Sequence, residues 1–305
     1  MSIKHFIAKS FFDFAYAIAY RPVNSPSDSN IPKGGAVPFT LLKPTLNCWY
    51  ADPLIGMVGG KECLFMEVYD RKKKKGMIGV SEFQANGKLT GPKIILEEPF
   101  HLSFPVVFTY NNKIILMPEC SASKTLRFYE INPDTFDVTL LKSFDVSKVL
   151  VDTVILINDN KKLVLLSCSE DAANPKKTSL AAFQINDLEN GELEELTLPS
   201  EYTVSSYLLR NGGPVVRSEN KTIRILQEST ETEYGHNLIL REIDNMDSLE
   251  NYSERDLRKI YLEDLPLSLP KTFRKQGIHT YSLGQKYEVV DVSFNRFHLG
   301  NIFKQ

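Results

Sequence analysis

Residues 47–70, NCWYADPLIGMVGGKECLFMEVYD, contain two apolar runs joined by a turn, and this pattern decides the fold. Gly59 and Gly60 lie between the runs and are followed by Lys61. Two such runs around a short glycine turn predict a β-hairpin. Asp52 stands directly before the first apolar run, a position that burial of a strand alone does not explain.

The turn of this hairpin recurs along the chain. Each copy is rich in Gly or Asn, ends in a lysine, and leads into a mostly apolar run with a polar ending. The turn lysines are Lys61, Lys113, Lys162, Lys221 and Lys286. Repeats of roughly 50 to 60 residues, each with three or four strands, are typical of propeller blades. The sequence therefore predicts an all-β fold, a five-bladed β-propeller of antiparallel sheets.

The propeller accounts for most of the chain. We expect residues 47–305 to form the five blades, and residues 1–46 to be a short N-terminal extension packed on them. A two-sheet sandwich would also be rich in strands, but it gives no reason for the turn to recur. The charged stretch 245–265, NMDSLENYSERDLRKIYLEDL, is the most helix-like part of the chain, and we expect an inserted loop or short helix there.

Composition excludes several classes of partner. The 36 Lys and Arg against 38 Asp and Glu give a net charge of −2, so the chain lacks the excess of basic residues that is typical of nucleic-acid-binding proteins. The run Lys72–Lys75 lies between apolar runs and is expected at a solvated hairpin tip. Four scattered cysteines, without C-x-x-C spacing, are expected to be reduced thiols. No stretch approaches the ~20 apolar residues of a membrane span.

The first residues, MSIKHFIAKSFFDFAYAIAYRPV, imitate a secretory signal, but Lys9 and Asp13 interrupt the apolar stretch that a signal requires. We therefore expect the chain to keep this segment and to act in the cytoplasm. Its aromatic residues could touch a membrane surface, although packing on the domain is the interpretation that we favour.

In a propeller, the inner strands converge on a central axis, and residues at their leading ends line a funnel. Those residues are Trp49, Tyr50, Asp52, His101, Asp152, Arg210, Asn211 and His279. The polar endings of the second strands add Glu67, Glu119 and Glu228. Carboxylates, histidines and an arginine next to aromatic rings have the hydrogen-bonding and stacking chemistry that sugars require.

Several motifs around these residues also resemble a known family. WYADPLI, EEPFHLSFPVVF, VDTVILI, RNGGPVVR and GIHTYS together resemble the N-terminal propeller domain of plant glucosamine inositolphosphorylceramide transferase and its stand-alone bacterial relatives. More distantly, they resemble the five-bladed arabinanase, levansucrase and invertase superfamily. The likeness runs from about Trp49 to the C-terminus.

The resemblance implies roles for three acids. Asp52 matches the first acid of the wider superfamily, Asp152 matches a third-blade funnel acid, and Glu119 matches an acid/base position. The chain lacks the Asn-Asp-Pro-Asn-Gly string of the invertases, so their substrate is not inherited. In the plant protein, a separate C-terminal domain resembles a sugar-nucleotide transferase, so the propeller's own activity does not follow from the likeness.

Each candidate also has a purely structural interpretation. An Asp before Pro is a common turn start, buried glutamates often pair with arginine, and single histidines are more often packing residues. Arg224 and Arg241 alternate outward in the predicted strands and are expected in solvent. No H-x-x-E-H or H-E-x-x-H string is present, so we predict neither a metal nor a cofactor.

Two functions follow from this set. The favoured one is a glycosyltransferase or glycoside hydrolase of surface-glycan biosynthesis, with Asp52, Glu119 and Asp152 in acid/base roles. Its substrate would be a sugar or glycan, with a nucleotide- or lipid-linked donor. The alternative is a non-catalytic glycan-binding or scaffolding propeller, in which the same acids only hydrogen-bond a sugar.

Overall fold

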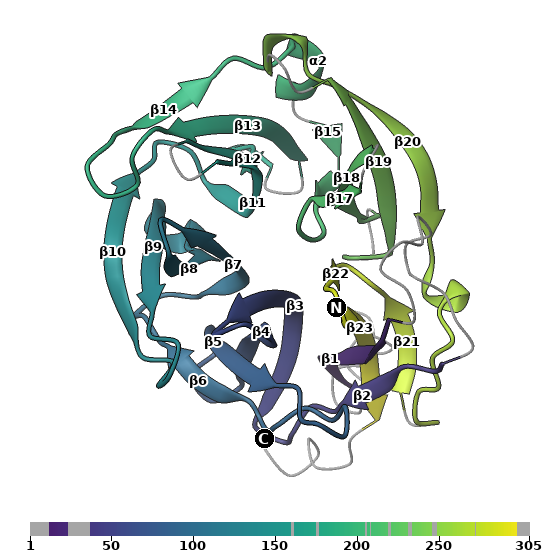
Figure 1. Cartoon of the computed structure of the whole chain (residues 1–305). Helices are drawn as coiled ribbons and strands as arrows, with labels where there is room; N and C mark the ends of the chain where they lie inside the picture. The colour runs from purple at the N-terminus through teal and green to yellow at the C-terminus, as the bar shows by residue number, and fades with distance from the viewer. Residues whose placement is uncertain are drawn as a thin grey trace.

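The computed structural model describes residues 12–23, 37–159, 162–174, 177–204, 206–207, 209–218, 221–230, 234–245, 249–271 and 273–297. Most of these residues are in strands, which form five antiparallel sheets around a central axis (Figure 1). The prediction of a five-bladed propeller is confirmed. Among the described residues, helical structure is limited to α2 (Ser200–Thr203) and three 3-10 turns.

Blades one to three follow chain order from the axis outward. Blade one contains β3 (Cys48–Val58), β4 (Lys61–Asp70), β5 (Lys75–Glu82) and β6 (Lys93–Leu96). Blade two contains β7 (Ser103–Tyr110), β8 (Lys113–Glu119), β9 (Thr125–Ile131) and β10 (Val138–Asp145). Blade three contains β11 (Leu150–Asn158), β12 (Leu163–Glu170), β13 (Lys177–Ile185) and β14 (Leu193–Leu196), with β15 (Ser206–Tyr207) paired to β13.

Blade four has a divided inner strand. It contains β16 (Leu209–Asn211) and β17 (Val216–Ser218), both paired to β18 (Lys221–Glu228), then β19 (Asn237–Asn245) and β20 (Ser253–Ile260). The expectation of an inserted loop or short helix over 245–265 is wrong for residues 253–260, which form β20, the outermost strand of the blade; short 3-10 turns at Leu249–Asn251 and Leu262–Asp264 flank it, and residues 246–248 lie outside the described residues. Among the apolar residues of β20, only Ile260 is buried, so this charged edge strand shows no apolar alternation that would reveal it from the sequence.

Blade five joins the two ends of the chain. It contains β1 (Phe12–Pro22), β2 (Thr40–Leu42), β21 (Phe273–Gly277), β22 (Tyr281–Leu283) and β23 (Tyr287–Phe297). Strand β1 pairs with β23 along its whole length. The structure thus differs from the expected extension, because residues 12–22 and 40–42 are strands of the propeller itself; residues 1–11 and 24–36 lie outside the described residues. Ala15, Ala17, Ile18 and Ala19 are fully buried, which explains the apolar run that imitates a signal.

The first two of the repeated turns have the backbone of tight hairpins. Gly59 and Gly60 have φ of 56° and 75°, and Asn111 and Asn112 have φ of 48° and 64°. Positive φ at both central residues is the type I′ geometry that matches the twist of a hairpin. The lysine run follows β4, where Asp70 accepts the backbone N–H groups of Lys72 and Lys73, so the prediction of a hairpin tip is confirmed.

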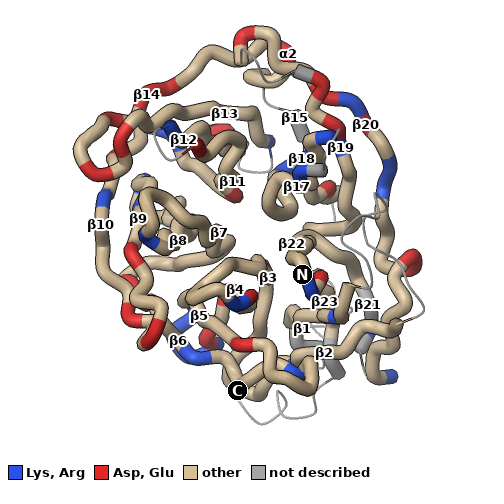
Figure 2. The backbone as a smooth tube through the Cα atoms, viewed as in Figure 1, with Lys and Arg blue, Asp and Glu red and all other residues tan. Residues whose placement is uncertain are grey.

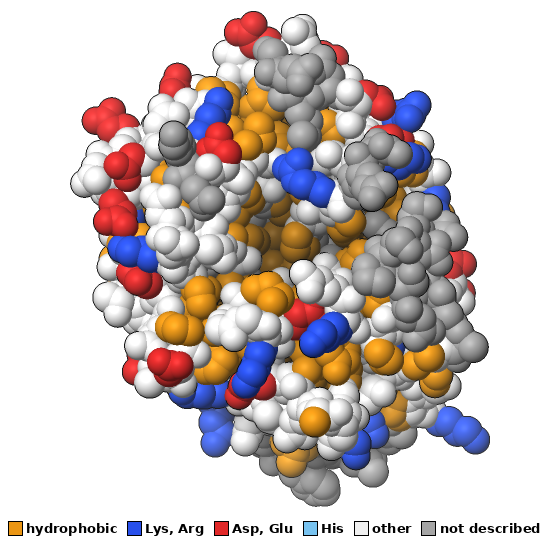
Figure 3. Space-filling model, viewed as in Figure 1, with side chains coloured by type: hydrophobic (Ala, Val, Ile, Leu, Met, Phe, Trp, Pro, Cys, Tyr) orange, Lys and Arg blue, Asp and Glu red, His pale blue; other side chains and the backbone are white. Residues whose placement is uncertain are grey.

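Apolar side chains pack between neighbouring blades. One buried cluster includes Leu54, Phe104, Val154 and Ile243, from blades one, two, three and four. Burial of apolar area at about 25 cal/mol per Å² is the main force that holds the blades together. Seen from the side shown in Figure 3, the centre of the molecule is hollowed, with hydrophobic side chains on its walls.

Two arginines differ from expectation. Arg224 is only 2% exposed and forms a 2.9 Å ion pair with Glu254, which is itself buried. Arg241 binds the same carboxylate at 2.9 Å and also pairs with Asp256. The expectation that both point into solvent is therefore wrong: they face the charged strand β20, and the acids on that strand balance them.

The remaining charge is dispersed. Figure 2 shows acidic and basic residues interspersed over the outer strands and loops. In the part of the chain that the structure describes, no helix is both long and apolar enough to cross a membrane.

Candidate functional site

Three inner strands break their register at equivalent points. The breaks lie between Ala51 and Leu54, between Ser103 and Val106, and between Val151 and Val154. At these bulges, Asp52, Phe104 and Asp152 have φ of 48°, 42° and 49°. Left-handed backbone is uncommon outside glycine, and residues held there tend to cluster at functional sites.

A carboxylate from the preceding blade holds the N–H of each bulge. Asp52 N–H donates to Asp291 Oδ2 at 3.1 Å, and Phe104 N–H donates to Asp52 Oδ2 at 3.2 Å. Asp152 N–H donates to Glu119 Oε2 at 2.9 Å. The acids are thus linked from blade five through blade three, and Asp52, Glu119 and Asp291 each stabilise a neighbouring blade.

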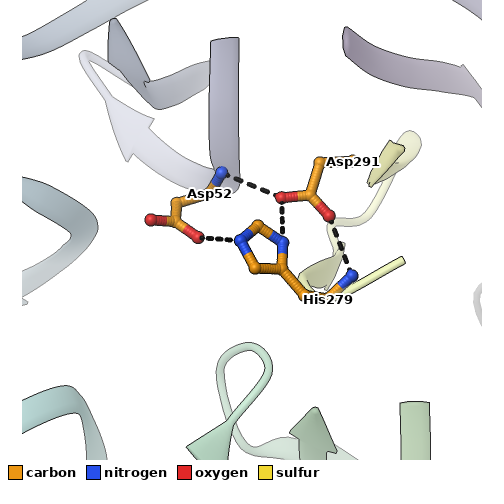
Figure 4. Close-up of side chains that lie close together, drawn as sticks. All are labelled: Asp52, His279 and Asp291. Carbon is orange, nitrogen blue, oxygen red and sulfur yellow. Dashed lines mark hydrogen bonds and ion pairs between the residues drawn. The ribbon is translucent and has the colours of Figure 1, made fainter. Parts of the chain in front are cut away.

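His279 lies between two carboxylates (Figure 4). Its Nδ1 is 2.5 Å from Asp291 Oδ2, and its Nε2 is 3.6 Å from Asp52 Oδ1. Asp291 Oδ1 also accepts the backbone N–H groups of His279 and Thr280, at 3.1 and 2.9 Å. Burial by itself would lower the pKa of His279, but the two carboxylates outweigh it and raise that pKa to about 9. The imidazole is therefore charged at neutral pH.

The same three residues offer ligand atoms within 4.8 Å of one another. Both imidazole nitrogens already face carboxylates, and the imidazolium supplies the positive charge that a cation would otherwise bring. We therefore assign Asp52, His279 and Asp291 to an ion-pair cluster.

Asp152 is the buried acid of blade three. Its Oδ2 accepts Gln227 Nε2 at 3.1 Å and lies 3.8 Å from Arg210 Nη1. Burial and the nearby Glu119 raise the pKa of Asp152 well above its usual value, although Arg210 opposes the shift. Arg210 also pairs with Glu170, so this predicted residue lies between two acids of blade three.

Asn211 has a supporting position. It is fully buried, and its Nδ2 donates to the carbonyls of Asp152 and Leu166 at 2.7 and 3.0 Å. Its Oδ1 accepts Arg224 Nε at 2.7 Å. The predicted contact of Asn211 with substrate does not fit this burial; the residue instead fixes the backbone of Asp152.

Glu67, His101 and Glu119 lie on blades one and two. His101 Nε2 is 3.4 Å from Glu67 Oε1, and Glu119 accepts the Ser121 hydroxyl at 2.9 Å. Burial, together with the charges of Asp52 and Glu119, raises the pKa of Glu67 well above its usual value. Burial also raises the pKa of Glu119, against the opposing charge of Arg210.

Aromatic rings surround these acids. Trp49 stacks on Tyr69 with ring centroids 4.5 Å apart, and Tyr16 stacks on His279 at 4.6 Å. Tyr234 lies 5.5 Å from His279 and is half-exposed. Tyr50, which the sequence paired with Trp49, instead packs in a buried cluster with Ile18 and Leu64, so Tyr69 takes its place as the stacking partner.

Glu228 does not join the set. It is bound to Lys259 on the outermost strand at 2.7 Å, whereas its neighbour Gln227 contacts Asp152. The sequence repeat could have identified Gln227 in place of Glu228, because Gln227 stands at the same distance from its turn lysine as Glu67 and Glu119 do from theirs. Asp291, Tyr16, Tyr69 and Tyr234 were also missed. Of these, Asp291 ends an apolar run like the other acids, so the same reasoning could have found it.

These features define a class: a five-bladed β-propeller in which acids, histidines and aromatic rings from successive blades gather at the bulged ends of the inner strands. A family model described as "Glucosamine inositolphosphorylceramide transferase 1, N-terminal" matches residues 43–265. The chain belongs to this family, and the resemblance seen in its motifs is confirmed.

Curated relatives carry the same name. Glucosamine inositolphosphorylceramide transferase 1 of Oryza sativa subsp. japonica is 27% identical over 285 residues, which cover 89% of this chain and 36% of the relative. The Arabidopsis thaliana protein is 33% identical over 109 residues, which cover 32% of this chain and 14% of the relative. The chain thus spans about a third of the length of the rice relative.

Solved structures share the fold. An α-L-arabinofuranosidase from Podospora anserina, in complex with cellotriose, matches with a TM-score of 0.56 over 94% of this chain and 98% of that chain, at 10% identity. An α-L-arabinofuranosidase from Lactobacillus brevis matches with a TM-score of 0.51 over 78% and 80%, at 14% identity. At these identities the likeness establishes the architecture alone.

Proposed function

We propose that this propeller binds a glycan and cleaves or transfers a glycosidic bond, with Asp52 and Asp152 as the carboxylates at its reacting centre. One observation carries the proposal: acids from blades one, two and three are buried together, and burial, with the charge of Asp52 adding to it, raises the pKa of Glu67, Glu119 and Asp152. Glycosidic bond chemistry needs one protonated and one ionised carboxyl group side by side, and mutual repulsion between buried acids produces that mixture.

The contacts suggest which carboxyl group acts as the base and which acts as the acid. Burial raises the pKa of Asp52, and the charged imidazole of His279 beside it opposes that shift; an Asp52 that is ionised here is suited to take a proton from water or an acceptor hydroxyl. A protonated acid on the other side of the sugar would protonate the leaving oxygen. Trp49 and Tyr69 supply the flat apolar surface on which a sugar ring stacks.

For the substrate, we extend the proposal to a sugar with a nucleotide- or lipid-linked donor, in a cytoplasmic step of surface-glycan synthesis. The name of the relatives contains both glucosamine and inositolphosphorylceramide, a lipid, which supports a lipid-linked reactant. The free thiols of Cys48, Cys63, Cys120 and Cys168 are in keeping with a reducing compartment.

A non-catalytic glycan-binding propeller is the second candidate. It is favoured by the hydrogen bonds in which Asp52, Glu119 and Asp291 hold backbone N–H groups of neighbouring blades. Acids with such structural duties could bind sugar hydroxyls without taking part in a reaction.

Trp49 makes the test direct, because it is the only tryptophan of the chain and lies in the proposed site. Titration with a panel of oligosaccharides and nucleotide sugars should change its fluorescence, and aryl glycosides or nucleotide sugars that bind should be turned over. Binding without turnover of any of them would favour the second candidate. The absence of both binding and turnover would contradict both candidate functions.

A further inference from the structure

We propose that Glu67 is a catalytic residue, a carboxylic acid that donates its proton to the departing sugar oxygen, and that His101 is the residue that positions it. This inference rests on the proposed function above. The sequence favoured Glu119 as proton donor, and the hydrogen bonds of the two glutamates distinguish them.

Both carboxylate oxygens of Glu119 already accept hydrogen bonds. Its Oε2 accepts the N–H of Asp152 at 2.9 Å, and its Oε1 accepts the hydroxyl of Ser121 at 2.9 Å. Arg210 adds a positive charge that favours the ionised form. A proton on Glu119 would weaken both hydrogen bonds, because a neutral carboxyl group is a poorer acceptor than a carboxylate.

The carboxyl group of Glu67 is not held in this way. It is 5% exposed, and within the described part of the chain its buried Oε1 has no hydrogen-bond partner. Leaving an ionised carboxylate buried in this way is unfavourable, whereas the neutral acid is tolerated. The charged groups that face it from neighbouring strands are Asp52 on β3, Glu119 on β8 and Asp291 on β23, and all three carry the same sign.

The His101 ring fixes which oxygen carries the proton. Its Nδ1 accepts the N–H of Gly76 at 2.9 Å, so the proton of the neutral ring is on Nε2, the atom 3.4 Å from Glu67 Oε1. Burial lowers the pKa of His101, which favours this neutral ring. The Nε2–H group lies beside Oε1 at 3.4 Å, too far for a good hydrogen bond but near enough to disfavour a second proton there, so the acid proton of Glu67 belongs on Oε2.

Because Gly76 has no side chain, Glu67 and His101 have room to approach each other beside it. A Cβ there would lie 2.6 Å from Glu67 Oε1 and 2.9 Å from His101 Cε1, and also 2.3 Å from the carbonyl oxygen of Leu102. Only a glycine allows carboxyl, imidazole and backbone to meet at this point, so the geometry is built into the strand.

The step balances as follows. The Oε2–H bond of Glu67 breaks and its proton goes to the glycosidic oxygen, which keeps the electron pair of the breaking bond to the anomeric carbon. A water or acceptor hydroxyl forms the new bond to that carbon and gives its proton to Asp52. Glu67 then regains a proton from solvent, and Asp52 releases one.

The first test compares leaving groups. Glu67→Gln should slow turnover of an aryl glycoside with a poor leaving group by roughly 10²- to 10⁴-fold, and should slow a dinitrophenyl glycoside far less, because that group departs without a proton. Glu62→Gln is the matched control: Glu62 is also buried on β4, but it accepts the N–H of Lys286 and should affect stability only. Equal losses on both glycosides, or a loss for Glu119→Gln but not for Glu67→Gln, would overturn the assignment.

The second test needs no substrate. Infrared difference spectra of wild type and Glu67→Gln should reveal a protonated carboxyl at pH 7 that is missing from the variant; a Glu67 that is ionised at pH 7 would overturn the inference even if no glycoside is turned over. His101→Phe removes the Nε2–H that favours the carboxylate, so this band should persist to higher pH. An unchanged titration of Glu67 in this variant would remove His101 from its positioning role.

Discussion

Replacing Asn211 with alanine tests the connection between the buried charges of blade four and the acid of blade three. The side chain is fully buried and makes three hydrogen bonds: to Asp152 O, to Leu166 O, and from Arg224 Nε. Asn211→Ala removes all three and leaves the Arg224 Nε–H without this acceptor.

The magnitude follows from those bonds. Each neutral hydrogen bond contributes about 1 kcal/mol, and the one from the charged guanidinium contributes about 2 kcal/mol. The sum predicts a loss of about 4 kcal/mol in the free energy of unfolding, a large part of the stability of an ordinary domain. Because Asn211 also fixes the carbonyl of Asp152, any turnover that depends on Asp152 should fall as well.

Urea unfolding followed by Trp49 fluorescence measures the change, with the slope of the transition checked against wild type. Asn186→Ala is the control, because Asn186 is an exposed asparagine of the same chain, where the loss should stay within about 0.5 kcal/mol. A loss of less than about 1 kcal/mol for Asn211→Ala would refute the argument that Asn211 stabilises the fold through two hydrogen bonds to blade three and one to Arg224 within blade four.

Two further predictions concern protonation and thiol reactivity. Because the pKa of His279 is raised from 6.5 to about 9 on folding, its stabilising contribution is complete below pH 6.5 and is lost as the pH rises through about 9. His279→Gln should remove that pH dependence from the free energy of unfolding, and parallel curves for variant and wild type would speak against the ion pair. Iodoacetamide at pH 8 should alkylate Cys48 in the native protein, because its thiol is partly exposed even though burial raises its pKa; buried Cys63, Cys120 and Cys168, whose pKa values burial raises to about 11, 12 and 11, should react only after unfolding. Mass mapping that finds a second native thiol modified would contradict the packing.

The five blades could be predicted because their signal is local. Each turn and its two apolar runs occupy neighbouring residues, so the repeat is visible without knowledge of long-range contacts. The closing strand β1 could not be found in this way, since its partner β23 lies at the other end of the chain. Its buried ion pair, Arg21 with Glu288 at 2.5 Å, likewise joins residues that no sequence window contains together.

The residues of the candidate site could be predicted only in part. Asp52, Asp152 and His279 follow from the repeat, but the direction of a side chain depends on strand parity, and a bulge changes that parity. Neighbouring residues of a strand point to opposite faces, so Trp49 and Tyr50 could not both face the site, and a slip of one residue exchanged Glu228 for Gln227. Tyr16 and Tyr234 come from elements that the repeat does not include.

The most direct test of the account is the turnover of Asp52→Asn and Asp152→Asn on whichever glycoside or nucleotide sugar the wild type converts, measured together with their free energies of unfolding. If these acids carry the chemistry, turnover should fall by roughly 10²- to 10⁴-fold, while both variants stay folded and keep affinity for the sugar. Variants that unfold more easily but turn over substrate at the wild-type rate would contradict the account and leave the acids as structural supports of the bulges.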